Sequence, residues 1–277
     1  MSKSTKIYPC LLDEDNDLSP ETPLYRYMSV EAFLYLFEFK RIPISRITEW
    51  PDSYEGTRFD FLKEVKKDKD FSDKNANDFY GSCWTLQTEE RSLYKNQKSF
   101  DAARRELAEK GSAAMWESYC KNGGVRIKTS LRRIESLFVL EMPEWNIYRG
   151  KVYYEPADEW GITSKAPSLI TTLLHKRVPF RSESEYRFIL VPDKKVTESR
   201  VTASVGDLYE FLDEILVAPA TSSNKWLSRT LYNVAVNLSI KDSPDSGSVN
   251  KKNGQQFCRI SQLYSPVSET LGHSDMA

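Results

Sequence analysis

The sequence predicts a mixed α+β domain in which mostly antiparallel strands form one or more central sheets flanked by helices. Segments with the two-residue alternation of strands and segments with the spacing of amphipathic helices follow one another without βαβ regularity. The 277 residues can bury a substantial core, and they show neither a repeat nor a clean break in composition. We therefore expect one domain over residues 23–263, with a polar arm at 1–22, a surface loop at 241–256 and a tail at 264–277.

The first half of the chain is expected to mix short strands with capped helices. Ser29 can cap a helix whose buried face consists of apolar residues at helical spacing: Val30, Phe33, Leu34 and Phe37. Gly111 separates two further helices, the first capped by Ser99 or Asp101 and the second by Ser112. The strands expected here cover 23–28, 42–45, 79–86 and 125–128, and the other helices cover 57–78, 100–110 and 112–120.

The second half continues the same mixture of elements. A helix over 223–237 is expected to carry Trp226 and Leu227 toward the core. Two further helices are expected at 131–140 and 168–176, and strands at 148–154, 200–204, 214–217 and 257–263.

Composition and charge narrow the classes of function. Lys+Arg 39 against Asp+Glu 40 gives a net charge of -1, which argues against a dominant polyanion-binding surface but leaves room for a local basic cleft. Four widely spaced cysteines without a C-x-x-C motif indicate neither a zinc site nor a disulfide framework. No apolar run reaches the roughly 18 residues of a membrane helix, and the first residues do not read as a signal peptide. We therefore expect a cytoplasmic protein without membrane contact.

Histidine is scarce, and this restricts the chemistry that the chain can perform. The two histidines are His175 and His273, and the second lies in the predicted tail. Mechanisms that need two histidines, and histidine-rich metal sites, are therefore nearly excluded.

The segment from Lys176 to Pro192 combines charged and apolar residues in a strand-like alternation. A continuous strand would place Glu183, Glu185 and Arg187 on one face, with the face becoming apolar further along. The two carboxylates would then stand about 6.6 Å apart, a spacing that suits two groups serving one small ligand without sharing a proton. The alternative is a solvated edge strand with a local Glu–Arg pair.

Three other segments could contribute to a site. Arg26 lies between Tyr25 and Tyr27, where it could bind a phosphate or could simply point to solvent beside two packed rings. Residues 50–56 form an acidic, aromatic loop that either lines a site or is a packed turn. The remaining candidates are hydroxyls on a predicted core strand, Ser82 and Thr85, and two aromatic residues on one helix face, Trp116 and Tyr119, for which core packing is the usual role.

These segments resemble a bacterial and phage family named domain of unknown function 2971. The resemblance covers roughly residues 24–263 and rests on YRYMS, WPDSYEG, MWESYCKNGGVRI and the ordered set Lys176, Phe180, Glu183, Glu185 and Arg187. Membership implies no common activity.

A second resemblance is to the R-S-E pattern of ADP-ribosyltransferases. Arg26, then Ser82 or Thr85, then Glu183-x-Glu185 occur in the order of that pattern, although YGSCWT departs from the usual S-T-S triplet. The resemblance implies an ADP-ribosyltransferase-like fold, NAD as substrate and no metal. Glu185 would stabilise the oxocarbenium-like sugar, and Glu183 would orient or deprotonate the acceptor.

The same resemblance implies supporting roles. Arg26 would clamp the pyrophosphate, and Ser82 would frame the pocket for the nicotinamide ribose. Arg187 would either neutralise Glu185 or brace it. Further residues expected to line or support this site are Tyr25, Tyr27, Thr85, Lys176, Trp50, Glu55, Trp116 and Tyr119.

Three hypotheses of function follow. The first is an NAD-dependent ADP-ribosyltransferase-like enzyme that modifies a protein or nucleic acid, as a toxin or phage-defence effector. The second is a non-catalytic nucleotide- or nucleic-acid-binding protein, based on Tyr25, Arg26, Lys176, Arg177 and Arg181. The third is a metal-dependent nuclease with Glu55, Glu183, Glu185 and Lys176 around magnesium.

Overall fold

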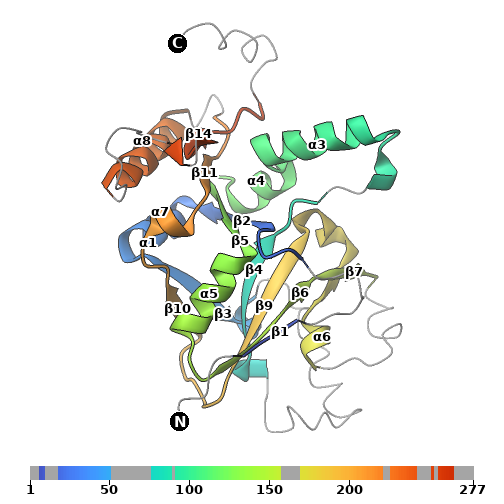
Figure 1. The fold of residues 1–277 in the computed structure, drawn as a ribbon, viewed down its shortest axis with the longest axis vertical. Coiled ribbons are helices and arrows are strands. Elements are labelled where there is room, and N and C mark those ends of the chain that lie inside the picture. The colour runs from blue at the N-terminus through green and yellow to red at the C-terminus, as the bar shows by residue number, and fades with distance from the viewer. Residues whose placement is uncertain are drawn as a thin grey trace, which may run out of the picture. The chain divides into compact units, whose positions relative to one another are not determined.

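The fold is mixed α+β with mostly antiparallel strand pairings, as the sequence predicts (Figure 1). It is seen in a computed structural model that describes residues 6–9, 18–50, 76–88, 91–156, 169–220, 225–241, 251–252 and 255–264. Residues 51–56 of the predicted loop, with Glu55, residues 57–75 of the predicted helix and most of the predicted arm and tail lie outside the described residues. The chain divides into two compact units, the first made of 1–24, 41–86 and 130–205, the second of 25–40, 87–129 and 206–277. The single-domain boundaries stay a prediction.

The first unit is built on a sheet of six strands. Their spatial order is β1 (Lys6–Pro9), β6 (Trp145–Lys151), β9 (Glu185–Pro192), β4 (Tyr80–Thr85), β3 (Arg41–Arg46) and β10 (Arg200–Ser204). All neighbours are antiparallel except β1 and β6, which run parallel. A separate parallel ribbon pairs β7 (Tyr153–Glu155) with β8 (His175–Arg177). Strand β9 is buried along its whole length.

Each face of this sheet is covered by different elements. On one face, helix α5 (Leu131–Glu141) packs Phe138 against Phe188 of β9, with ring centroids 5.3 Å apart. The opposite face carries an apolar cluster whose members are Ile47, Phe79, Ile170, Leu173, Leu174, Ile189 and Val191, with Trp50 packed against it. The elements contributing to this cluster include the single-turn helix α6 (Leu169–Thr172) and the 3₁₀ turn η1 (Ile47–Glu49).

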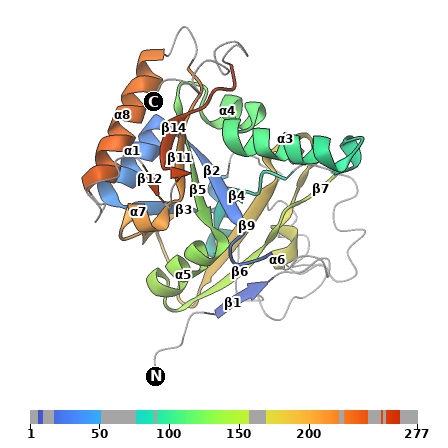
Figure 2. The same ribbon diagram turned by 45° about the horizontal axis from the view of Figure 1, so that its top comes forward.

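The second unit has four main strands and most of the helices. The strands follow the order β2 (Pro23–Ser29), β5 (Gly124–Ser130), β11 (Glu214–Val217) and β14 (Cys258–Ile260). The helices are α1 (Val30–Phe39), α3 (Gln97–Lys110), α4 (Ala113–Tyr119), α7 (Leu208–Phe211) and α8 (Lys225–Lys241). Helix α8 lies along β14 and β11, as both views show (Figures 1 and 2). A short hairpin joins β12 (Lys251–Lys252) to β13 (Gln255–Gln256) within the predicted surface loop.

Helix caps explain where several helices begin. The hydroxyl of Ser29 accepts from the Ala32 amide, and that of Ser112 accepts from the Met115 amide, as predicted. Helix α3 begins earlier than expected, because the side chain of Asn96 caps it and Ser99 completes a capping box three residues later. The prediction of Ser99 or Asp101 as the cap was therefore wrong.

Three further sequence predictions are corrected. The helix expected over 168–176 ends at Thr172, and the chain continues as the strand β8. Leu34 and Trp226 are 45% and 69% exposed, because α1 buries Phe33, Leu36 and Phe37 instead and α8 turns a different face inward.

Among the described helices, none has both the length and the apolar run that crossing a bilayer requires.

The turn into β5 depends on a glycine. Gly124 has φ 157°, and a Cβ placed on it would lie 2.1 Å from the Met28 carbonyl oxygen and 2.9 Å from the Cys120 sulfur. Since both neighbours are buried and one is backbone, the close approach admits no side chain here. Gly124 is thus a packing requirement between β2, the end of α4 and β5.

We expect Gly124→Ala to lower the free energy of unfolding by about 3 kcal/mol, because β2 or Cys120 must move to admit the methyl group. Urea denaturation followed by circular dichroism measures the loss. Gly206→Ala is the control, since Gly206 also has a positive φ (61°) but nothing lies within 4 Å of its Cβ position. An equal loss in both variants would show that backbone conformation, not the close approach, makes Gly124 necessary.

Candidate functional site

The segment before β9 has a break that the alternation pattern did not indicate. Residues Val178–Glu183 form a 3₁₀ helix, η5, and Ser184 follows with φ 44°, so the strand begins only at Glu185. Pro179 at the start of η5 favours this helical turn. Glu183 therefore ends a helical turn and is not a strand residue, which corrects the prediction of a continuous strand through both carboxylates.

The backbone of Glu185 is held on both sides. Its amide donates to the Tyr154 hydroxyl at 2.8 Å, and its carbonyl accepts from the Val152 amide at 2.9 Å. One residue earlier, the carbonyl of Ser184 accepts from the Leu86 amide at 2.9 Å. The first residue of β9 is thus fixed by β7 and by the end of β4, which makes its side chain a rigid feature.

Four ionisable side chains meet at this point and form what we call the buried charge cluster: Lys176, Glu183, Glu185 and Arg187. The Lys176 ammonium donates to Oε2 of Glu183 at 2.5 Å and to Oε1 of Glu185 at 2.7 Å. Arg187 donates from Nε to Oε2 of Glu185 at 2.7 Å and from Nη2 to Oε1 at 3.2 Å. Its Nη1 donates to the Leu173 carbonyl at 2.8 Å. The four residues are only 5%, 7%, 6% and 1% exposed, so their pairing is a condition of folding.

The two carboxyl groups have different protonation behaviour. Burial, together with the hydrogen bond and the charge of Glu185, raises the pKa of Glu183 to about 7. Burial also opposes ionisation of Glu185, but the Arg187 guanidinium outweighs it and holds the pKa of Glu185 well below its ordinary value. Below about pH 7 the pair therefore shares one proton, carried by Glu183 and hydrogen-bonded to Glu185. This corrects the expectation that the two carboxylates stand apart.

Aromatic rings cover the cations of the cluster. Trp50 lies over Arg187, with 4.6 Å from the guanidinium carbon to the ring centroid. The same ring lies against Gly81 of β4, where a Cβ would be 2.1 Å from the indole. The ring centroid of Phe180 in η5 lies 4.7 Å from the Lys176 ammonium nitrogen. Trp50 therefore contacts the buried charge cluster, and Gly81 is the residue that admits its ring.

The register of β4 and β9 separates the two candidate hydroxyls. Thr85 is the cross-strand partner of Glu185, and Cys83 is the partner of Arg187, so both lie on the face of the cluster. Ser82 pairs with Phe188 on the opposite face, where its hydroxyl accepts from the Trp84 indole at 3.1 Å. The hydroxyl beside Glu185 is thus that of Thr85, and the assignment of Ser82 to this site is corrected.

The predicted phosphate-binding residues belong to the second unit. Tyr25 and Tyr27 are buried, and Arg26 between them is half-buried. The Tyr25 ring lies 4.7 Å from the guanidinium carbon of Arg126, and the Tyr27 hydroxyl accepts from the Gln87 amide at 2.7 Å. The two tyrosines therefore belong to a polar network of their own unit.

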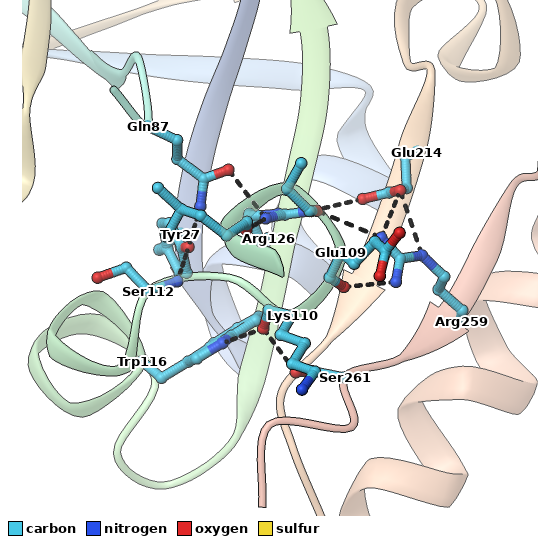
Figure 3. Close-up of polar contacts among 12 residues, drawn as sticks. Tyr27, Gln87, Glu109, Lys110, Ser112, Trp116, Arg126, Glu214, Arg259 and Ser261 are labelled. Atoms are coloured by element: carbon cyan, nitrogen blue, oxygen red, sulfur yellow. Dashed lines mark hydrogen bonds and ion pairs between the residues drawn. The ribbon is translucent and has the colours of Figure 1, made fainter. Parts of the chain in front are cut away.

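Arg126 is the centre of that network, and sequence reasoning did not single it out (Figure 3). It is fully buried and donates to the side chains of Gln87 and Glu214 at 2.9 and 2.7 Å. It also donates to the carbonyls of Leu107 and Ala108 at 3.2 and 2.6 Å. A buried arginine in the alternating segment VRIK carries no local signal, because the partners come from distant parts of the chain.

Other donors complete the same network at the end of α3. Arg259 donates to Glu214 and to the Glu109 carbonyl, and the carbonyl of Lys110 accepts from the Trp116 indole at 2.9 Å and from the Ser261 hydroxyl at 2.6 Å (Figure 3). Helix α3 buries none of its own residues, so these bonds to its last carbonyls hold it.

The two remaining aromatic candidates, Trp116 and Tyr119, differ in burial. Trp116 is buried and meets the Tyr27 ring edge-on, with centroids 4.8 Å apart, which is a packing role. Tyr119 is 44% exposed and therefore does not share that buried face, contrary to the shared helix face in the sequence. Both residues belong to the second unit.

Sequence reasoning also missed residues on the β7–β8 ribbon. His175 contacts Glu155, with 3.2 Å between Nδ1 and Oε2, and its ring packs on Tyr153. Tyr154 contacts Glu185 as described above. The strand predicted over 148–154 is divided at Val152 into the end of β6 and the start of β7, and this interruption has no clear sequence signal.

Comparison with known proteins adds no relative: no family profile, curated protein or solved structure matches the chain. Both resemblances stated from the sequence therefore stay predictions.

We expect Glu183 to make stability depend on pH between its ordinary pKa of 4.5 and its folded pKa of about 7. In this window the folded state keeps a proton that the unfolded state has lost, so stability falls as pH rises, by at most about 3 kcal/mol. Glu185, whose pKa is lowered, loses its stabilising contribution only at more acidic pH. Urea titrations at several pH values should show the slope in the wild type and a reduced slope in Glu183→Gln. Equal slopes would contradict the raised pKa.

We expect Lys176→Met to destabilise the chain by about 3–5 kcal/mol, because it leaves two buried carboxyl groups without their shared cation. Lys194→Met is the matched control, since Lys194 pairs with Glu144 on the surface with 80% of its side chain exposed. Its midpoint of urea unfolding should stay at the wild-type value. If both variants unfold alike, the buried ion pairs contribute no more than a surface pair.

Proposed function

We propose that the buried charge cluster is the catalytic centre of an NAD-dependent ADP-ribosyltransferase-like enzyme. The observation that carries the proposal is the hydrogen-bonded pair Glu183–Glu185, whose environments separate the two pKa values. Two carboxyl groups with separated pKa values are the usual basis for dividing acid–base and electrostatic roles in one site. The ordered Arg, Ser/Thr and E-x-E residues of the sequence support the same class of reaction.

The proposed reaction breaks the bond between the nicotinamide nitrogen and C1′ of the ribose. The bonding electrons leave with the nitrogen, which neutralises the pyridinium, and positive charge develops on the sugar. Glu185, ionised near neutral pH, would stabilise that charge. The acceptor then forms a bond to C1′ and gives its proton to Glu183, whose pKa of about 7 lets its ionised form act as a base.

The cations of the cluster would act on the carboxylates and not on the substrate. Arg187 contacts both oxygens of Glu185 and fixes the plane of that carboxylate, while Trp50 covers the guanidinium. Lys176 joins the two carboxyl groups. Thr85 supplies a hydroxyl on the same sheet face. Arg26 as the pyrophosphate clamp stays part of the proposal through the sequence resemblance alone.

A second candidate is a nucleotide-binding protein without turnover. It is favoured by one observation: both oxygens of Glu185 accept hydrogen bonds from cations, which reduces the charge that it can offer to a developing carbocation. In this case the same residues would hold a nucleotide but would not release nicotinamide.

We expect the purified chain to release nicotinamide from NAD, and Glu185→Gln to lower kcat by about 100-fold to 1,000-fold. Chromatography of nicotinamide over time gives the rate. Glu198→Gln, which changes an exposed carboxylate of the same unit, should keep the wild-type rate. The pH profile of the wild type should rise through about pH 7 as Glu183 ionises. NAD binding without nicotinamide release would replace the enzyme by the second candidate, and an unaffected Glu185→Gln would reject the catalytic role of the cluster.

A further inference from the structure

Tyr154 is placed beside the proposed catalytic carboxylate by the ribbon that carries it. Its cross-strand partner in the parallel pairing of β7 and β8 is Lys176, so both side chains leave the ribbon on one side. Lys176 binds Glu185 by its side chain, and the Tyr154 hydroxyl accepts from the Glu185 amide at 2.8 Å. Tyr154 thus contacts the same residue from the backbone side.

The hydrogen bond from Glu185 fixes what the phenol can do. A tyrosine hydroxyl has one proton to donate, and the bond from the amide occupies one of its lone pairs. Within the ranges that the structure describes, the hydroxyl proton has no acceptor. Burial first, and then the charge of Glu185, raise the pKa of Tyr154 well above its ordinary value, so the group keeps its proton near neutral pH. Tyr154 is therefore a donor and not a base.

Exposure distinguishes Tyr154 from the cluster that it contacts. Lys176, Glu183 and Glu185 are buried, whereas Tyr154 is half-buried. Its neighbour Tyr153 lies on the other side of the ribbon and packs on the His175 ring, with centroids 5.8 Å apart. Of the two adjacent tyrosines, Tyr154 alone combines contact with Glu185 and partial exposure.

We propose that Tyr154 is the substrate-facing donor of the site and binds a ribose hydroxyl oxygen of the nucleotide. This inference rests on the proposed function and adds a specificity-determining residue to it. Glu185 offers a carboxylate acceptor and Tyr154 offers an O–H donor from adjacent positions. A sugar hydroxyl matches this pair because it can donate to the carboxylate and accept from the phenol at the same time. The recognised group is the 2′-hydroxyl of the nicotinamide ribose, next to the carbon at which the bond breaks.

The test compares Tyr154→Phe with Tyr153→Phe on two substrates, NAD and its analogue lacking the 2′-hydroxyl of the nicotinamide ribose. Nicotinamide release gives kcat and KM for each. Tyr154→Phe should lower kcat/KM for NAD by about 10-fold to 100-fold, the effect of one hydrogen bond from a neutral donor to a group polarised by a carboxylate. With the analogue, Tyr154→Phe should match the wild type. Tyr153→Phe should match the wild type on both substrates.

Each other outcome counts against the inference in a recognisable way. If Tyr154→Phe keeps full activity on NAD, the inference falls while the proposed function stands. If Tyr154→Phe loses the same factor on both substrates, Tyr154 acts by holding the Glu185 backbone and not by binding the hydroxyl. A matching fall in the midpoint of urea unfolding would accompany that structural role. If the wild type releases no nicotinamide from NAD, the proposed function and this inference fall together.

Discussion

The structure of the first unit depends on the burial of the Arg187–Glu185 ion pair. Removing an ion from water costs several kcal/mol even after relaxation, so each charge needs partners that replace its hydration. Arg187 finds them in both oxygens of Glu185, in the Leu173 carbonyl and in the face of Trp50. Glu185 has further partners in Glu183 at the end of the 3₁₀ turn η5 and in Lys176 on the ribbon β7–β8.

The second unit also buries an arginine whose hydrogen-bond partners replace its hydration. Arg126 is also fully buried, but its partners include one carboxylate and two helix carbonyls in place of a bidentate carboxylate. The last carbonyls of a helix carry a partial negative charge, which makes a buried guanidinium a suitable cap. Helix α3 buries none of its residues, so it has no buried apolar face to hold it in place. The hydrogen bonds from Arg126 to its last carbonyls serve this purpose instead. One arginine thus orders the Glu185 carboxylate, and the other orders the end of a helix.

The sequence predicted local elements better than the site. The strands at 200–204 and 214–217 agree with β10 and β11, because short β-branched runs between turn residues are a local signal. Alternation also predicted that the Glu185 face of β9 becomes apolar, which Ile189 and Val191 confirm. It failed at Ser184, where a left-handed residue ends a 3₁₀ turn and moves Glu183 within reach of Glu185. Tertiary structure brings the two carboxyl groups together and creates the contacts of Tyr154 and Arg126. No spacing of residues in the sequence predicts these contacts.

The charge balance of the buried cluster connects its stability with its proposed chemistry. Two cations and two carboxyl groups would balance if both carboxyls were ionised, yet burial keeps a proton on Glu183 below about pH 7. With that proton present the cluster holds two positive charges and one negative charge. Loss of the proton removes the excess positive charge and would give the base of the proposed reaction. Ionisation of Glu183 lowers the stability of the folded chain as pH rises, and the same ionisation would activate the proposed site. Function and stability would therefore place opposite demands on this carboxyl group, as is common at strained functional sites.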